Sequence, residues 1–156
     1  MKERQGEHPL GDVGQIIAFI IFIIIWAADS FLFDFSTQLN ARVPFYSKTI
    51  VTIVIFAVSL YLLATSYKVI TGDHRPRRVI TSGVFKYIRH PMYLSAVLFY
   101  LGLVVSSLSI VSFLMWILIF IFYNYIAGYE EKLMEMKYGE EYISYKQITG
   151  KWLPKF

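Results

Sequence analysis

Long apolar runs separated by charged clusters dominate this sequence. One run covers Val13–Phe33, and a second, between Lys48 and Lys68, contains no charged residue. A helix needs roughly 20 apolar residues to cross about 30 Å of hydrocarbon, so each run predicts one membrane-spanning helix. The first run contains the acid Asp29, which together with Asp34 we expect to mark the outer interface of the membrane.

A third uncharged run, Pro91–Tyr129, is 39 residues long. One straight helix of that length would measure about 58 Å, nearly twice the hydrocarbon thickness. The polar cluster Ser106–Ser109 stands near its middle, and helices satisfy their own backbone hydrogen bonds in lipid. The predicted fold is therefore an all-α membrane bundle of four transmembrane helices, the last two forming a tight hairpin, followed by an amphipathic C-terminal cytoplasmic helix.

The composition agrees with a membrane protein. Residues of the AVILMFWYC set make up 56% of the chain and charged residues 17%, whereas soluble domains are about 45–50% apolar. Disordered chains, coiled coils and nucleic-acid-binding proteins need a charge-rich sequence, so no nucleic-acid partner is expected. The absence of cysteine excludes disulfides and thiolate ligands, and three scattered histidines give no metal-binding spacing.

The distribution of Lys and Arg predicts the topology. With four crossings, the amino terminus, the 71–90 loop and the tail after Tyr129 share one side of the membrane. Thirteen of the fifteen basic residues fall on this side, including Lys68 just before the loop. The other side holds Arg42 and Lys48. Basic residues accumulate on the cytoplasmic side. We therefore expect an integral, multi-pass protein of the lipid bilayer whose amino terminus, 71–90 loop and C-terminal tail are cytoplasmic.

Two cytoplasmic segments carry the residues that favour chemistry. Pro91 suits the first turn of the third helix and leaves Arg89 and His90 at the helix entrance, where free amides and the positive end of the dipole suit a carboxylate. Glu130 and Glu131 stand at the cytoplasmic end of the fourth helix, where negative charge opposes the dipole. Either the helix continues past them, or they face a cation, or they are solvated surface.

Two segments resemble a known superfamily. The segment Val79–Tyr93 reads VITSGVFKYIRHPMY, in which Thr-x-Gly-x-aromatic precedes Arg-His-Pro-x-Tyr. After the expected hairpin, Glu130–Pro154 contains a Glu-Glu pair nine residues before a Gly that follows an aromatic residue, then Tyr-x-x-Tyr and a closing Pro. In this combination, over roughly its last 85 residues, the chain resembles the isoprenylcysteine carboxyl methyltransferase and phospholipid methyltransferase superfamily.

The resemblance implies an integral membrane enzyme that transfers a methyl group from S-adenosyl-L-methionine to a lipophilic acceptor, either isoprenylcysteine-carboxylate-like or phospholipid-like, without a metal. It implies one domain, 1–156, in which 1–70 forms two N-terminal helices and 71–156 the cofactor-binding catalytic core. The catalytic residues it implies are Arg89, His90 and Glu130. The residues it implies around the cofactor are Val79, Ile80, Phe85, His90, Pro91, Met92, Tyr93, Glu130, Glu131 and Tyr142.

Two positions depart from the family pattern. Ser95 stands where the family usually has Gly. Prenylcysteine enzymes have an Arg, thought to hold the substrate carboxylate, a few residues before the Glu pair, whereas the polar residues Asn124 and Tyr125 of that segment are uncharged here. An acceptor carboxylate would lack that partner here. Two other functions stay open: an NADPH-dependent membrane reductase of the sterol-reducing type, which shares a related carboxy-terminal arrangement, and a non-catalytic membrane subunit.

Overall fold

The structure, a computed structural model, describes residues 11–71 and 79–155. The α-helices of these ranges are α1 (Gly11–Ala27), α2 (Phe45–Thr71), α3 (Pro91–Ser107), α4 (Ile110–Tyr138) and α5 (Glu140–Ile148). Short π- or 3-10-helical turns occupy Ala28–Phe33, Gln38–Ala41 and Gly83–Lys86. No strand occurs in the described ranges, so the all-α prediction is confirmed for them. The amino-terminal residues 1–10 and residues 72–78 of the 71–90 loop lie outside them.

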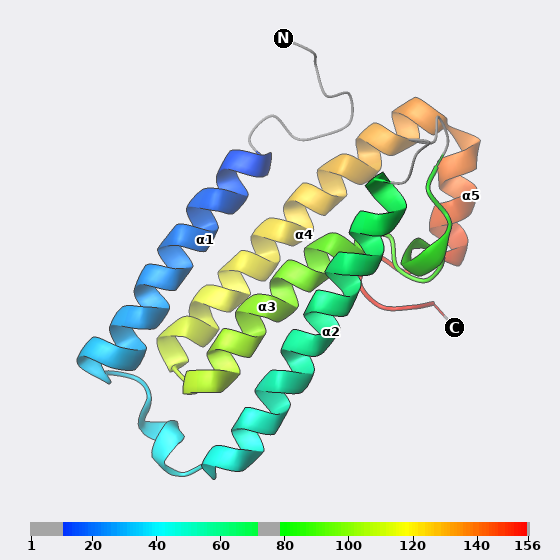
Figure 1. Cartoon of the computed structure of the whole chain (residues 1–156). Coiled ribbons are helices and arrows are strands. Elements are labelled where there is room, and N and C mark those ends of the chain that lie inside the picture. The colour runs from blue at the N-terminus through cyan, green and yellow to red at the C-terminus, as the bar shows by residue number, and fades with distance from the viewer. Residues whose placement is uncertain (1–10, 72–78, 156) are drawn as a thin grey trace.

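Helices α1 to α4 lie side by side in an elongated bundle, and α5 folds back at one end (Figure 1). The helix α2 packs along α3, α3 along α4, and α1 along α4, so α1 and α2 flank the α3–α4 pair. A buried core joins α1, α3 and α4. Its members are Phe22, Val97, Tyr100, Val104, Ile119 and Tyr123.

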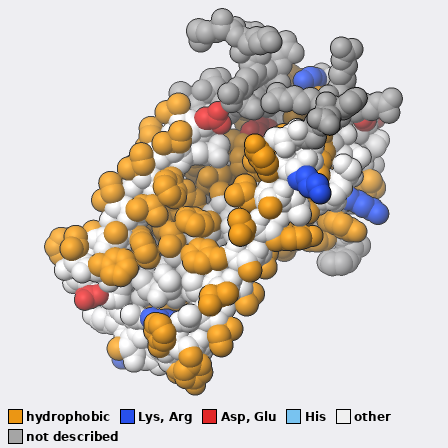
Figure 2. All heavy atoms as spheres, in the orientation of Figure 1, with side chains coloured by type: hydrophobic (Ala, Val, Ile, Leu, Met, Phe, Trp, Pro, Cys, Tyr) orange, Lys and Arg blue, Asp and Glu red, His pale blue; other side chains and the backbone are white. Residues whose placement is uncertain are grey.

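Three helical segments of the described chain are long and apolar enough to cross a membrane: Gly11–Phe33, Phe45–Thr71 and Ile110–Tyr138. They match three of the four expected crossings, whereas the apolar helix α3, with 17 residues, is shorter. Figure 2 shows apolar side chains over the flanks of the bundle and charged side chains toward its two ends. A broad exposed apolar surface of this kind is typical of a face that contacts lipid.

The helices α3 and α4 are joined by Leu108 and Ser109. Leu108 ends α3 in the left-handed conformation (φ 51°), and its N–H donates to the Val104 carbonyl. The Ser109 hydroxyl accepts a hydrogen bond from the Ser112 N–H over 3.0 Å. This is the N-cap arrangement that satisfies a free amide at a helix start, and it lets α4 begin with two residues between it and α3.

The helix α1 is attached to the bundle at several points along its length. Gly14 lies against Phe122 of α4, where an added Cβ would approach the ring to 2.8 Å. Further along, the Phe22 ring packs edge-on against Tyr100 with centroids 4.8 Å apart, and the Trp26 indole N–H donates to a carbonyl of α3 over 2.9 Å. These contacts fix which face of α1 is turned toward the bundle.

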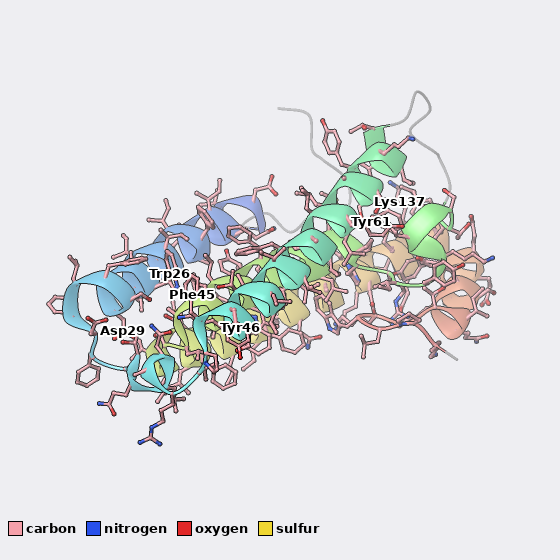
Figure 3. All side chains as sticks on the ribbon, turned by 60° about the horizontal axis from the view of Figure 1, so that its bottom comes forward. Trp26, Asp29, Phe45, Tyr46, Tyr61 and Lys137 are labelled. Carbon is pink, nitrogen blue, oxygen red and sulfur yellow. The ribbon has the colours of Figure 1, made fainter. Side chains whose placement is uncertain are left out.

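Asp29, which we expect at the outer interface of the membrane, is buried within the protein, with 5% of its surface exposed. Its carboxylate accepts hydrogen bonds from the Ser36 N–H (3.0 Å), the Ser36 hydroxyl (2.5 Å) and the Ser109 hydroxyl (2.5 Å). Asp29 lies in the π-helical turn Ala28–Phe33 at the end of α1 (Figure 3). Its hydrogen bonds therefore join the end of α1 to the start of α4.

Asp29→Asn should lower the free energy of unfolding by about 2 kcal/mol, because an amide with one acceptor oxygen replaces a carboxylate that accepts three hydrogen bonds. Thermal unfolding in detergent measures the change. Asp34→Asn is the matched control, since Asp34 is exposed and accepts one 3.2 Å bond from Thr37; its effect should stay within about 0.5 kcal/mol. Equal losses in the two variants would contradict the importance of the buried cluster.

Candidate active site

A cavity of about 450 Å³ opens at the end of the bundle that carries α5. Its volume lies within the range of roughly 300–1,000 Å³ that is usual for small-molecule sites. Side chains from every α-helix and from the segment before α3 line it. They are Gly11, Asp12, Gln15, Ile70, Val79, Ile80, Phe85, Arg89, His90, Pro91, Met92, Tyr93, Glu130, Met134, Tyr138, Tyr142 and Tyr145.

The cavity brings together most of the residues that the sequence motifs single out. Its lining includes Arg89 and nine of the ten cofactor residues implied by the resemblance, while the tenth, Glu131, lies outside the lining. Sequence reasoning missed the start of α1, above all Asp12 and Gln15. The available signal was Gln15, an amide side chain within the first apolar run. Within the described ranges, no cluster of His, Asp and Glu side chains suits a metal ion.

The local backbone explains why the motif residues meet. Pro91 occupies the first turn of α3, as predicted, and His90 is the N-cap residue. The helix α4 continues past Glu130 and Glu131, so the first of the alternatives for these acids holds, and the second holds as well for Glu131, which faces Arg89 and Lys146. Gly139 then ends α4 with φ 54°, in the left-handed region that glycine adopts without strain. This turn brings α5 back toward the start of α3.

Glu131 is the centre of a buried ion cluster. Its Oε1 accepts hydrogen bonds from Arg89 Nε at 2.9 Å and from His90 Nε2 at 3.2 Å, and its Oε2 lies 3.2 Å from Lys146 Nζ. The Arg89 and Glu131 side chains are 8% and 7% exposed. The Glu131 carboxylate finds these donors within the protein. It therefore holds neighbouring segments together and does not line the cavity.

Arg89 ties the tail of the chain to the Arg-His-Pro turn. Its Nη1 donates to the carbonyls of Lys146 (3.2 Å) and Thr149, and its backbone N–H donates to the Gly150 carbonyl over 2.9 Å. Arginine side chains that bond the last carbonyls of a helix stabilise its C-terminus. Although Arg89 also lines the cavity, its guanidinium is therefore already engaged by Glu131 and the end of α5.

Glu130, the neighbour of Glu131, lines the cavity. The Tyr93 hydroxyl donates to its Oε1, and His90 Nδ1 lies 4.0 Å from its Oε2. The His90 and Tyr93 rings stack in parallel, with centroids 5.7 Å apart and an interplanar angle of 4°. A carboxylate beside stacked rings suits a ligand that carries an ammonium group, hydroxyl groups or a flat heterocycle.

Burial keeps the ionisable rings around the cavity in their neutral forms. It lowers the pKa of His90 below its ordinary value, an effect that the neighbouring Glu131 opposes in part. It raises the pKa of Tyr145 to about 12 and also raises the pKa of Tyr142. The Tyr145 hydroxyl donates to the Phe85 carbonyl over 2.6 Å. This part of the cavity wall is therefore aromatic and uncharged at neutral pH.

Asn124 contacts the tail instead of the cavity. Its Oδ1 accepts hydrogen bonds from Lys151 Nζ at 2.9 Å and from Trp152 Nε1 at 3.1 Å. Neither Asn124 nor Tyr125 belongs to the cavity lining. In the segment before the Glu-Glu pair, Asn124 therefore anchors the C-terminal segment of the chain.

A comparison with protein families matches the central part of the chain. A family model described as phospholipid methyltransferase covers residues 45–141, more than half of the sequence. The matched segment contains the whole of α2, α3 and α4 and leaves α1 outside. No curated protein and no solved structure matches the chain.

Arg89→Lys should loosen the attachment of α5. Lysine keeps the positive charge but cannot bond Glu131 and two carbonyls at once. Amide hydrogen exchange should rise over α5, and the unfolding free energy in detergent should fall by about 1–3 kcal/mol. Arg42→Lys, the same substitution at an exposed position, should leave both unchanged. Unaltered exchange over α5 in Arg89→Lys would contradict the anchoring role.

His90→Gln should flatten the pH dependence of stability between about pH 7 and pH 5. Because the pKa of His90 in the folded protein lies below the ordinary 6.5, the unfolded chain takes up more protons as the pH falls, and the folded state loses stability there. Thermal midpoints of the wild type should thus fall more steeply on acidification than those of the variant. Parallel curves for the two proteins would rule out a buried, neutral His90.

Proposed function

The chain belongs to the phospholipid methyltransferase family, and we propose that it transfers a methyl group from S-adenosyl-L-methionine to a lipophilic acceptor in the membrane. Family membership supports membrane methyltransferase activity. The observation that carries the finer proposal is the cavity in which Glu130 stands beside the stacked rings of His90 and Tyr93.

The residues of the cavity fit the groups of S-adenosyl-L-methionine, which supplies a methyl group activated by a sulfonium. Glu130 would bind the ammonium or the ribose hydroxyls. The amides at the start of α3, beside Pro91, would bind the carboxylate at the positive end of the helix dipole. Phe85 and Tyr142 would contact the adenine and the sulfonium by stacking and cation–π interaction.

The three residues proposed as catalytic would have separate roles. Glu130 would contact the donor directly. His90, uncharged at neutral pH, would pack against the cationic donor without repelling it. Arg89, together with Glu131, would act by holding α5 and the start of α3 around the cavity. The apolar sides of the donor would be lined by Val79, Ile80 and Met92.

Methyl transfer from a sulfonium is an in-line displacement in which positive charge disperses, so the protein mainly has to align the acceptor and exclude water. The aromatic side chains of α5 would exclude water from the cavity, since Tyr142 and Tyr145 are buried beside it. A carboxylate or thiolate acceptor needs no general base, and an amine acceptor needs only to arrive unprotonated.

A second cavity, of about 420 Å³, supports the proposal of a lipophilic acceptor. It lies where α1 and α2 flank α3, and it shares Gln15, Met92 and Tyr93 with the first cavity. The rest of its lining is mainly apolar and includes Phe19 and Phe99. The hydrocarbon chain of an acceptor would enter this groove sideways from the bilayer and present its polar end to the shared residues.

A phospholipid-like acceptor agrees better with the local charges than an isoprenylcysteine-like carboxylate. Asp12 and Glu130 line the first cavity, so an ammonium headgroup would meet opposite charge there, whereas an acceptor carboxylate would lie beside negative charge. In the segment before the Glu-Glu pair, the polar side chain of Asn124 is hydrogen-bonded to the tail.

We also propose four crossings in which α3 and α4 form a transmembrane hairpin. The helix α3 rises about 26 Å, close to the hydrocarbon thickness of about 30 Å, and two residues separate its end from the start of α4. The excess of basic residues in the 71–90 loop and the tail then favours a cavity at the cytoplasmic surface. The catalytic core, 71–156, would be completed by α1, whose start also lines the cavity.

Glu130→Gln should weaken the binding of S-adenosylhomocysteine by about ten- to a hundredfold, because the variant loses a charge-assisted hydrogen bond to the ligand. Titration of the purified protein in detergent measures the affinity. Glu140→Gln, at an exposed position at the start of α5, should bind like the wild type.

For the wild type, saturating S-adenosylhomocysteine should raise the thermal midpoint, since a ligand stabilises a folded state that binds it. Stabilisation by NADPH and not by S-adenosylhomocysteine would favour the reductase. Stabilisation by neither ligand would favour a non-catalytic subunit and overturn the proposed donor.

A further inference from the structure

The helix α1 contributes to both cavities, although it lies outside the segment that matches the family. Its residues Asp12, Gln15 and Phe19 recur three or four positions apart, and residues at this spacing share one face of a helix. Gly14 holds a neighbouring face of α1 against Phe122 of α4, and the Asp12–Phe19 face lines the cavities. The family-matched helices therefore do not enclose the site by themselves.

Gln15 stands where the two cavities meet. It lines both of them together with Met92 and Tyr93 at the start of α3. The Tyr93 hydroxyl donates to Glu130, the acid proposed to bind the donor. Gln15 thus lies between the donor side of the site and the groove for the hydrocarbon chain, where the polar end of an acceptor would be.

The Gln15 amide is a strong hydrogen-bonding group on an apolar helix. In the part of the chain that the structure describes, no hydrogen bond joins this side chain to another protein group. An amide carries two N–H donors and an acceptor oxygen, and at this place they are open to the cavities. The half-buried side chain is therefore suited to bind a polar group of a ligand at the junction.

The charges at the junction favour a headgroup that carries hydrogen-bond donors. Asp12 lies one turn before Gln15 and lines the first cavity together with Glu130, so oxygen atoms from three side chains border this region. Arg89, the arginine of that lining, is engaged by Glu131 and by carbonyls at the end of α5. An N–H or O–H group of a ligand would donate to the Gln15 amide oxygen here, and the N–H groups of the same amide would donate to a phosphate.

We propose that Gln15 is a specificity-determining residue whose side-chain amide binds the polar headgroup of a lipid acceptor at the junction of the two cavities. This inference rests on the proposed methyltransferase function and adds to it that α1 selects which headgroup reaches the donor. The amide favours a headgroup with N–H or O–H groups beside a phosphate over an isolated carboxylate.

Methyl transfer to phosphatidylethanolamine in phosphatidylcholine vesicles tests the role of Gln15. Gln15→Met keeps the length of the side chain and removes its polar groups, so kcat/KM for the lipid should fall about tenfold. The affinity for S-adenosylhomocysteine should stay within about twofold of the wild type, which also shows that the variant is folded. Gln38→Met, at an exposed position in the turn Gln38–Ala41 and outside both cavity linings, is the matched control and should leave both values unchanged.

The possible contrary results distinguish a failure of the role of Gln15 from a failure of the proposed methyltransferase function. An unchanged kcat/KM in Gln15→Met, or an equal loss of S-adenosylhomocysteine affinity, would overturn the role of Gln15 and leave the methyltransferase function standing. A wild type that methylates a farnesylated cysteine in preference to phosphatidylethanolamine would also overturn it. A wild type that binds no S-adenosylhomocysteine and transfers no methyl group would overturn the proposed function and this inference with it.

Discussion

The buried carboxylate of Glu131 is the interaction on which the arrangement of the candidate site depends. It joins Arg89 at the entrance of α3 and Lys146 of α5 to its own helix, α4. The Arg89 guanidinium extends the same network to the last carbonyls of α5. A charge buried to this extent must stay paired, because removing its partner is strongly destabilising. The three helices therefore cannot separate at this end without breaking the cluster, and the cavity between them keeps its walls together.

The adjacent residues Glu130 and Glu131 of α4 face different surroundings: Glu130 lines the cavity, and Glu131 belongs to the ion cluster. Successive residues on a helix point about 100° apart. When Glu131 is turned toward the ion cluster, Glu130 is turned toward Tyr93 and the cavity. A Glu-Glu pair in a sequence does not say which member supports the site and which faces it. The distinction comes from cations on segments remote in the chain, since Arg89 stands 42 residues before Glu131.

The local signals of the sequence predict the helices well, and most of the motif residues line one cavity. Apolar runs give the long helices, and Pro91 gives the start of α3. The burial of Asp29 could not be predicted, because its partners Ser36 and Ser109 stand 7 and 80 residues away. Which face of α1 is turned toward the bundle, and with it the place of Gln15 in the cavity wall, could not be predicted either. In a lipid-facing helix, apolar side chains cover both the bundle face and the lipid face, so the polar–apolar periodicity that would orient α1 is weak.

Along α1, the contacts that hold the helix in the bundle are separate from the residues that line the cavities. Phe22, Trp26 and Asp29 hold the half that is remote from α5 (Figure 3), whereas Asp12 and Gln15 line the cavity at the other end. A substitution at the cavity end therefore leaves the buried contacts that hold α1 in place. The proposed donor contacts come from the segments around α3, α4 and α5. A different acceptor headgroup could then be accommodated by changes in α1 alone, without disturbing the ion cluster that holds the donor side of the site together.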